Sequence, residues 1–176
     1  AAVNAIGQGI QAATTLQPLL MGIVIAVVVG ILLTMPTSSA AICIAIGLGG
    51  VAGGAAVVGC AAHMIGFAVA SFKDNGISGV VSQGLGTSML QIPNVLRKPI
   101  ILLPAVIASA IVGPIATVGF ELACTATGAG MGTAGLVGVF GVIEASQEIM
   151  STGQLWTAII LLMFILPAVI ASVVAY

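Results

Sequence analysis

The chain has 176 residues, of which 60% are hydrophobic and 4% charged, and its formal net charge is −1. Its mean hydropathy is +1.34, and no Asp, Glu, Lys or Arg precedes Lys73. Soluble domains carry charge on about a quarter of their residues, so this composition excludes one. It also excludes a nucleic-acid-binding protein, because such proteins need a basic surface.

The N-terminal region predicts an interfacial helix followed by a membrane span. Residues 1–15 mix small apolar and polar side chains, which suits a helix lying along the membrane surface. Pro18 follows at a position typical of a helix start. Residues 19–33 contain eleven Leu, Ile or Val, so membrane insertion is favourable by about 5 kcal/mol. Pro36 and its polar neighbours end this span.

The next segment, residues 40–71, is uncharged and has two interpretations. As one straight helix it would be about 48 Å long, well above the roughly 30 Å of a hydrocarbon core. Its middle, residues 47–54, is rich in glycine. The segment is therefore either one tilted or broken span, which we favour, or a tight hairpin of two short segments.

A polar region separates this segment from the next span. Residues 72–78 predict a turn, residues 94–99 predict a loop, and residues 79–92 are too short and polar to span. We expect an interfacial or re-entrant segment over 79–92. The basic residues of the chain all lie in the turn and the loop: Lys73, Arg97 and Lys98. By the positive-inside rule, both face the cytoplasm.

Two further spans are predicted. Residues 100–118 form one, with Pro104 and Pro114 inside it, and residues 155–175 form the last. Between them, residues 125–141 are uncharged and glycine-rich, which indicates a second re-entrant hairpin. The heptapeptide LPAVIAS occurs once in each span, at 103–109 and 166–172. Such a repeat indicates either duplicated helices, as in many transporters, or convergent membrane composition.

These elements add up to an all-α, polytopic transmembrane protein with broken or re-entrant glycine-rich segments. We expect four to five spans and one or two re-entrant segments in a single membrane domain, residues 1–176. A transmembrane β-barrel would need short alternating segments, whereas these apolar runs are continuous.

The titratable side chains in the apolar regions are few. Cys43, Cys60 and Cys124 lie in apolar runs and predict buried, unpaired thiols. His63 is the only histidine and offers one donor and one acceptor to a hydroxylated ligand, or packs against a backbone carbonyl. No second histidine or nearby carboxylate completes a metal site. No catalytic motif or cofactor fingerprint is present, so the chain is not expected to be catalytic by itself.

Glu144 is the leading candidate for solute binding, since ionisable groups near a membrane core are costly. It follows the glycine-rich segment, whereas Glu148 lies four residues later and can share one solvated helical face with it. Neutral side chains at the helix breaks either line a polar path or satisfy free backbone groups; they are Thr37, Ser38, Ser39, Gln83, Thr87, Ser88 and Gln91.

These features resemble the membrane component, enzyme IIC, of bacterial phosphotransferase-system sugar permeases, and within it the PfoR-like branch. The resemblance rests on Pro36-Thr37-Ser38-Ser39, a glycine-rich run, the lone His63, and Gly141-Val142-Ile143-Glu144. The last is similar to the G-I-T-E motif, in which the glutamate binds a sugar hydroxyl beside a re-entrant hairpin. The chain is about half the length of a complete IIC protein.

The resemblance implies a multi-pass protein of the bacterial inner membrane that carries a sugar-like solute. It implies substrate-binding roles for Glu144, His63, Gly141 and Glu148, a cytoplasmic IIB-type partner, and a homo-oligomer or pairing with another half. The residues leave two alternatives open. One is a PfoR-like membrane regulator or scaffold without transport, and the other is an oligomeric channel.

Overall fold

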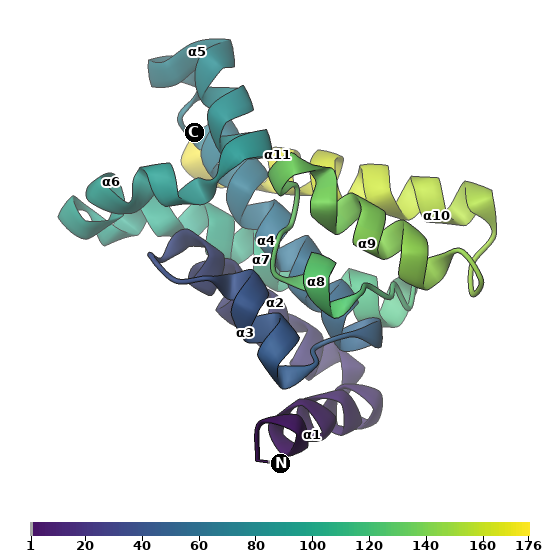
Figure 1. Ribbon diagram of the computed structural model, residues 1–176. Coiled ribbons are helices and arrows are strands. Elements are labelled where there is room, and N and C mark those ends of the chain that lie inside the picture. Colours follow the sequence, from purple (N-terminus) through teal and green to yellow (C-terminus); the bar gives the residue numbers. More distant parts are fainter. Residues whose placement is uncertain (1) are drawn as a thin grey trace.

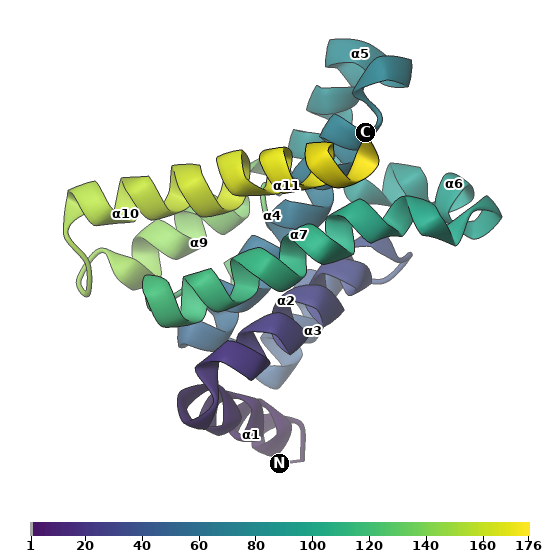
Figure 2. The ribbon, with the colours of Figure 1, turned by 180° about the vertical axis from the view of Figure 1, so that it is seen from behind.

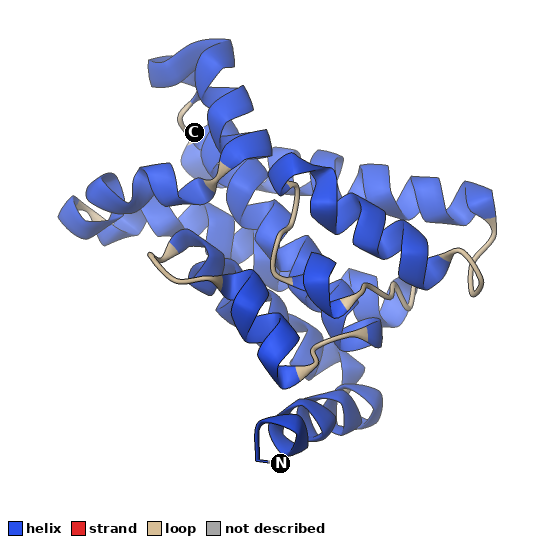
Figure 3. Ribbon diagram, in the orientation of Figure 1, coloured by secondary structure: helices blue, strands red, loops and turns tan. Residues whose placement is uncertain are grey.

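The structure is a computed structural model that describes residues 2–176, with side chains from Gly7 onward. Helices follow one another along the described chain, which contains no β-strand (Figure 3). The α-helices are α1 (Ala2–Leu16), α2 (Pro18–Thr34), α3 (Ser39–Ile46), α4 (Gly50–Ala70), α5 (Phe72–Val81), α6 (Ile92–Arg97), α7 (Leu103–Pro114), α8 (Ala126–Ala129), α9 (Val137–Ser146), α10 (Thr152–Ala158) and α11 (Leu166–Ala175). The predicted all-α fold is confirmed.

Wider and tighter helical turns connect several of these elements. They are η1 (Ser82–Gly86), η2 (Ser88–Gln91), η3 (Pro99–Leu102), η4 (Ile115–Gly119), η5 (Ala134–Leu136) and η6 (Ile159–Ile165). Because such turns continue a helix, α7 belongs to one helix over Pro99–Gly119, and α10 and α11 to one over Thr152–Ala175.

Three described helices are long and apolar enough to cross a membrane: Gly50–Ala70, Pro99–Gly119 and Thr152–Ala175. The last two confirm the spans predicted at 100–118 and 155–175. α2 begins at Pro18, as predicted, and its 17 residues reach the lower end of the range for a span. The chain is therefore a multi-pass membrane protein.

Helix α4 forms the centre of the fold, and α2, α7 and α11 pack around it (Figures 1 and 2). Small side chains let these helices approach closely. A Cβ on Gly59 would overlap the backbone of Ala26 in α2, and one on Gly54 would overlap Leu122. Close contact of this kind drives helix association in lipid, where apolar burial gives little net gain.

The break in residues 40–71 differs from both interpretations. α3 ends at Gly47, which adopts a left-handed conformation with φ 64°, and the chain then reverses before α4 begins. Ser39, at the start of α3, bonds Gly130, and the nearby Gly132 packs on Cys60 in the middle of α4, so α3 runs back from the middle of α4 toward its start (Figure 1). One broken span is therefore wrong, and α4 alone is too long to be half of a short hairpin.

The two polar connections are more helical than predicted. α5 covers the expected turn at 72–78 because Gly76, at φ 58°, kinks the chain without ending it. α6 covers most of the expected loop at 94–99, with Pro93 in its first turn, where a proline costs no hydrogen bond. It stops before Pro99, as the residue preceding a proline disfavours helix.

The fold has two distinct ends. The basic end comprises the end of α4, α5, α6 and the end of α11, which lie together in Figure 2. There the Lys73 ammonium lies 3.8 Å from the centre of the Tyr176 ring. The opposite end comprises the start of α4, Glu121 and the end of α9. Cys43, Cys60 and Cys124 are buried and unpaired, as predicted.

Candidate functional site

Residues 122–146 form a hairpin whose two ends are joined at the opposite end of the molecule. The buried Ser146 hydroxyl donates to the Ala123 carbonyl at 2.8 Å and accepts from the Ala123 amide at 3.0 Å. The tip of the hairpin reaches halfway along α4, because a Cβ on Gly132 would overlap Cys60 and Ala61. The chain thus enters the helix bundle and returns to the same end.

Two other breaks in the helices meet the tip of this hairpin. The Ser39 hydroxyl, at the start of α3, donates to the Gly130 carbonyl at 2.6 Å. The Thr133 hydroxyl donates to the Gly84 carbonyl in η1 at 2.5 Å. Side chains therefore satisfy backbone carbonyls that helix breaks leave free, which is how irregular backbone persists inside a membrane protein. We call this meeting point the junction; its described members are Ser39, Gly84, Gly130 and Thr133.

A buried polar cluster lies beside the junction and links three elements. The Thr34 hydroxyl in α2 lies 3.1 Å from His63 Nδ1 in α4 and 3.2 Å from the Ser88 hydroxyl in η2. All three residues are fully buried. Thr34 also donates to the Gly30 carbonyl of its own helix.

The hydrogen bonds of Thr34 favour one tautomer of His63. A threonine hydroxyl carries one hydrogen, and a carbonyl can only accept. When Thr34 donates to Gly30, both the His63 Nδ1–H and the Ser88 hydroxyl can donate to Thr34, and all three bonds form. His63 Nε2 is then a bare acceptor, and it is the buried side-chain atom without a partner in the described residues.

A cavity of about 520 Å³ opens next to this cluster. Its walls come from the loop between α2 and α3, from Gly86, Thr87 and Met89, and from the hairpin tip at Met131 and Ala134. Leu33 precedes Thr34 along the chain, and Thr87 and Met89 flank Ser88, so the cluster lies directly behind the cavity wall. The volume falls in the usual range for small-molecule sites.

The structure separates the four predicted binding residues. His63 is buried in the cluster, and Gly141 packs on Gly128, with its carbonyl accepting from the Thr125 amide at 3.2 Å. Glu144 is exposed on α9, and Glu148 is exposed in the turn that follows this helix. No contact joins His63 to either glutamate in the described residues, so the four roles stay predictions.

Sequence reasoning missed Thr34, Thr133 and Gly130. Thr34 ends an apolar span and Thr133 lies in a glycine-rich stretch, so neither stands out from its neighbours. Ser39 and Ser88 were expected either to line a path or to satisfy free backbone groups. Ser39 satisfies the Gly130 carbonyl and also lines the cavity, whereas Ser88 bonds a side chain.

A protein family matches the chain over its full length. The family is described as "Phosphotransferase system, EIIC", and the match covers residues 1–176. The chain belongs to this family. Neither the curated proteins nor the solved structures contain a match.

Membership in the phosphotransferase-system EIIC family indicates which kind of membrane protein this helical chain belongs to. The family comprises the membrane permease components of the system, so the chain is part of such a component. It also confirms the resemblance that the motif at 141–144 indicated.

Proposed function

We propose that the chain carries a sugar-like solute across a bacterial inner membrane as the permease component of a phosphotransferase system. A IIB-type protein would phosphorylate the solute on the cytoplasmic side, since no phosphoryl-accepting group is evident among the described residues. The chain would act as a homo-oligomer or together with another half.

The observation that supports this proposal best is the junction. Three interrupted segments, from α3, η1 and the 122–146 hairpin, meet halfway along the central helix beside a cavity of about 520 Å³. Discontinuous helices near the membrane centre are where transporters bind their solutes, because the freed backbone and nearby hydroxyls offer polar groups. A regulator or scaffold would have no need for a cavity at this meeting point.

The side chains around the junction suit a hydroxylated solute. Thr37, Ser38 and Thr87 line the cavity. The Thr37 hydroxyl donates to the Leu32 carbonyl and can accept from a solute, whereas the Ser38 and Thr87 hydroxyls accept from backbone amides and can donate to it. His63, behind the wall, would hold Thr34 and Ser88 in place as a positioning residue.

The predicted role of Glu144 would be at an entry site, which lies on the same solute path as the junction. Glu144 lies two residues before Ser146 at the closed base of the hairpin, on an exposed face that also carries Phe140. A solute approaching from the opposite end would meet this carboxylate before the junction. We propose that Glu144 holds solute hydroxyls there, with Glu148 beside it and Gly141 letting α9 pack closely on α8.

The test is calorimetric binding of hexoses and hexitols to the detergent-purified chain. Thr37→Val removes a hydroxyl from the cavity wall, and Glu144→Gln removes the carboxylate of the entry site. Each is expected to weaken binding about tenfold, as the loss of a charged or well-placed hydrogen bond does. Thr157→Val is the matched control, because this exposed threonine of α10 bonds only the Gly153 carbonyl of its own helix.

Two results would contradict the proposal. Absence of binding by a folded wild-type chain across the panel would favour the regulator or scaffold. Flux through proteoliposomes that rises without saturation would favour the channel. Binding lost in only one of the two variants would show whether the solute occupies the junction cavity or the entry site.

A further inference from the structure

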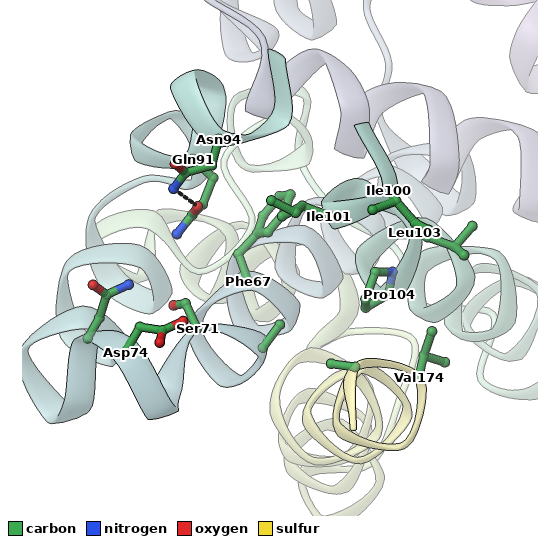
Figure 4. A pocket seen from close by; sticks show the side chains of 13 residues that line it. Phe67, Ser71, Asp74, Gln91, Asn94, Ile100, Ile101, Leu103, Pro104 and Val174 are labelled. Carbon is green, nitrogen blue, oxygen red and sulfur yellow. Dashed lines mark hydrogen bonds between the residues drawn. The ribbon is translucent and has the colours of Figure 1, made fainter. Parts of the chain in front are cut away.

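A second cavity, of about 610 Å³, lies at the basic end of the molecule. It is bounded by the end of α4, the start of α5, α6, η3 and the end of α11 (Figure 4). None of its lining residues belongs to the cavity at the junction. We call it the basic-end cavity.

The walls of this cavity differ sharply in polarity. Figure 4 shows Ser71, Asp74, Gln91 and Asn94 on one side, and Ile100, Leu103, Pro104 and Val174 on the other. Phe67 lies between the two groups. An occupant must therefore carry polar groups on one face and carbon-bound hydrogens on the other.

Amide side chains build the polar wall into a connected network. Asn94 donates to Gln91 at 2.8 Å, Gln91 donates to Gln83 at 2.9 Å, and Gln83 donates to Ser71 at 2.9 Å. Gln83 and Gln91 are only 3% and 5% exposed, so their orientations are fixed by these bonds. The network leaves the Asn94 carbonyl oxygen free at one end and the Ser71 hydroxyl hydrogen free at the other.

The electrostatics of the cavity favour a neutral occupant. Asp74 is the only charged side chain among the described lining residues. The neighbouring Lys73 ammonium lies over the Tyr176 ring. Asp74 would repel a phosphate ester or another anion. A simple cation would pair with Asp74 but could not accept from the second N–H groups of Gln91 and Asn94.

Hydroxyl groups match this wall, because each both donates and accepts. Asp74 and the free Asn94 oxygen accept hydrogen bonds from such hydroxyls, while Ser71 and the amide N–H groups donate hydrogen bonds to them. The apolar wall, with Phe67 and Pro104, suits the C–H face of a carbohydrate ring or a polyol chain. The match is therefore to a neutral, polyhydroxylated molecule.

The position of the cavity links it to the junction. The Phe67 ring meets the His63 ring edge-on, with centroids 6.1 Å apart. In η2, Met89 lines the junction cavity and Gln91 lines the basic-end cavity, so η2 lies between the two. We propose that the basic-end cavity is a second solute site, which holds the unphosphorylated solute on the basic side of the junction. This inference rests on the proposed function.

Site-specific protection of a thiol tests the inference in the full chain. The native cysteines are buried, so Ile100→Cys places one reactive thiol on the cavity rim, where Ile100 is 72% exposed. Glucose and mannitol should slow maleimide labelling of this thiol several-fold, whereas glucose 6-phosphate and ethanolamine should not. Val118→Cys, 54% exposed at the opposite end, is the control that should label equally fast with and without sugar.

A second substitution connects the protection to the chemistry. Asp74→Asn or Asn94→Ala, added to Ile100→Cys, should abolish protection by glucose. Both side chains are exposed, so the variants are expected to fold. Glu121→Gln makes the same carboxylate-to-amide change at the opposite end and should leave protection intact.

The outcomes separate this inference from the proposed function. Calorimetric binding that depends on Thr37, without protection at Ile100→Cys, would overturn the second site and leave the proposed function standing. Protection by ethanolamine but not by glucose would overturn the assignment to polyols. Absence of any sugar binding by the folded wild-type chain would overturn both proposals.

Discussion

The closed base of the 122–146 hairpin makes a quantitative prediction for Ser146→Ala. The Ser146 hydroxyl is the sole described partner of both the amide and the carbonyl of Ala123, and both residues are buried. An unsatisfied buried polar group costs about 1–3 kcal/mol, so losing two partners should lower the free energy of unfolding by about 2–6 kcal/mol.

Ser172→Ala is the matched control for this substitution. Its hydroxyl donates to the Ala168 carbonyl one turn earlier in α11, at 2.6 Å, and that carbonyl is an acceptor within the helix itself. Alanine is also the better helix former, so this control should change stability by less than about 0.5 kcal/mol.

The assay is reversible unfolding in mixed micelles, titrated with SDS, together with hydrogen exchange at the Ala123 amide. Exchange at this amide should speed up in Ser146→Ala because the hairpin base opens. If Ser146→Ala and Ser172→Ala agree within about 0.5 kcal/mol, the hairpin base contributes no stability and the reasoning is refuted.

Three further predictions use the same titration or NMR. Thr34→Val leaves two buried donors without an acceptor, so it should cost about 2–4 kcal/mol; a loss below about 0.5 would contradict the cluster. Gly59→Ala overpacks the contact between α4 and α2 and should cost about 1–3 kcal/mol. By contrast, Gly9→Ala, which meets open space, should stabilise α1 by up to about 1 kcal/mol; equal effects would contradict the packing. In ¹⁵N spectra of the imidazole, His63 should be protonated at Nδ1, and a proton on Nε2 would refute the tautomer.

The spans were predictable because the membrane imposes a length and a composition that one segment must satisfy by itself. Residues 100–118 and 155–175 are continuous apolar runs, and the structure extends each by only a few residues. Pro104 and Pro114 lie inside the continuous helix Pro99–Gly119 without ending it. The tighter turns of η3 come before Pro104 and the wider turns of η4 after Pro114, and such local adjustments are how membrane helices tolerate proline.

The reversal after α3 was not predictable from the segment that contains it. A glycine such as Gly47 permits a kink and a reversal equally, and the choice falls to distant residues. Ser39 is bonded to Gly130, and Gly50 to Cys124. These partners lie in a hairpin whose position is itself set by contacts with α4.

The same reasoning applies to the candidate site. His63 could be singled out because it is the only histidine, but its partner Thr34 lies 29 residues away. Thr34 lies in turn 54 residues from Ser88. Pairs so far apart become neighbours only once α2, α4 and η2 have packed. The sequence therefore indicates which side chain is unusual, whereas the fold determines what it contacts.

The three polar features lie in order along the fold, and this order can be tested. Glu144 lies two residues before Ser146, and the hairpin base there is next to the start of α4, where Cys124 bonds Gly50. Ile100 lines the basic-end cavity with Phe67 and Ala70, at the end of α4. With 21 residues, α4 is about 31 Å long, so we expect the two positions on opposite sides of a bilayer.

A membrane-impermeant maleimide should therefore label Glu144→Cys from one side of oriented vesicles and Ile100→Cys from the other. By the positive-inside rule, Ile100→Cys, next to Arg97 and Lys98, should react from the cytoplasmic side. Labelling of both positions from the same side would contradict the order of Glu144, junction and basic-end cavity. Labelling of Glu144→Cys from either aqueous side would also show that this face of α9 meets water. The native carboxylate would then avoid the cost of about 2.5–3.5 kcal/mol of facing lipid.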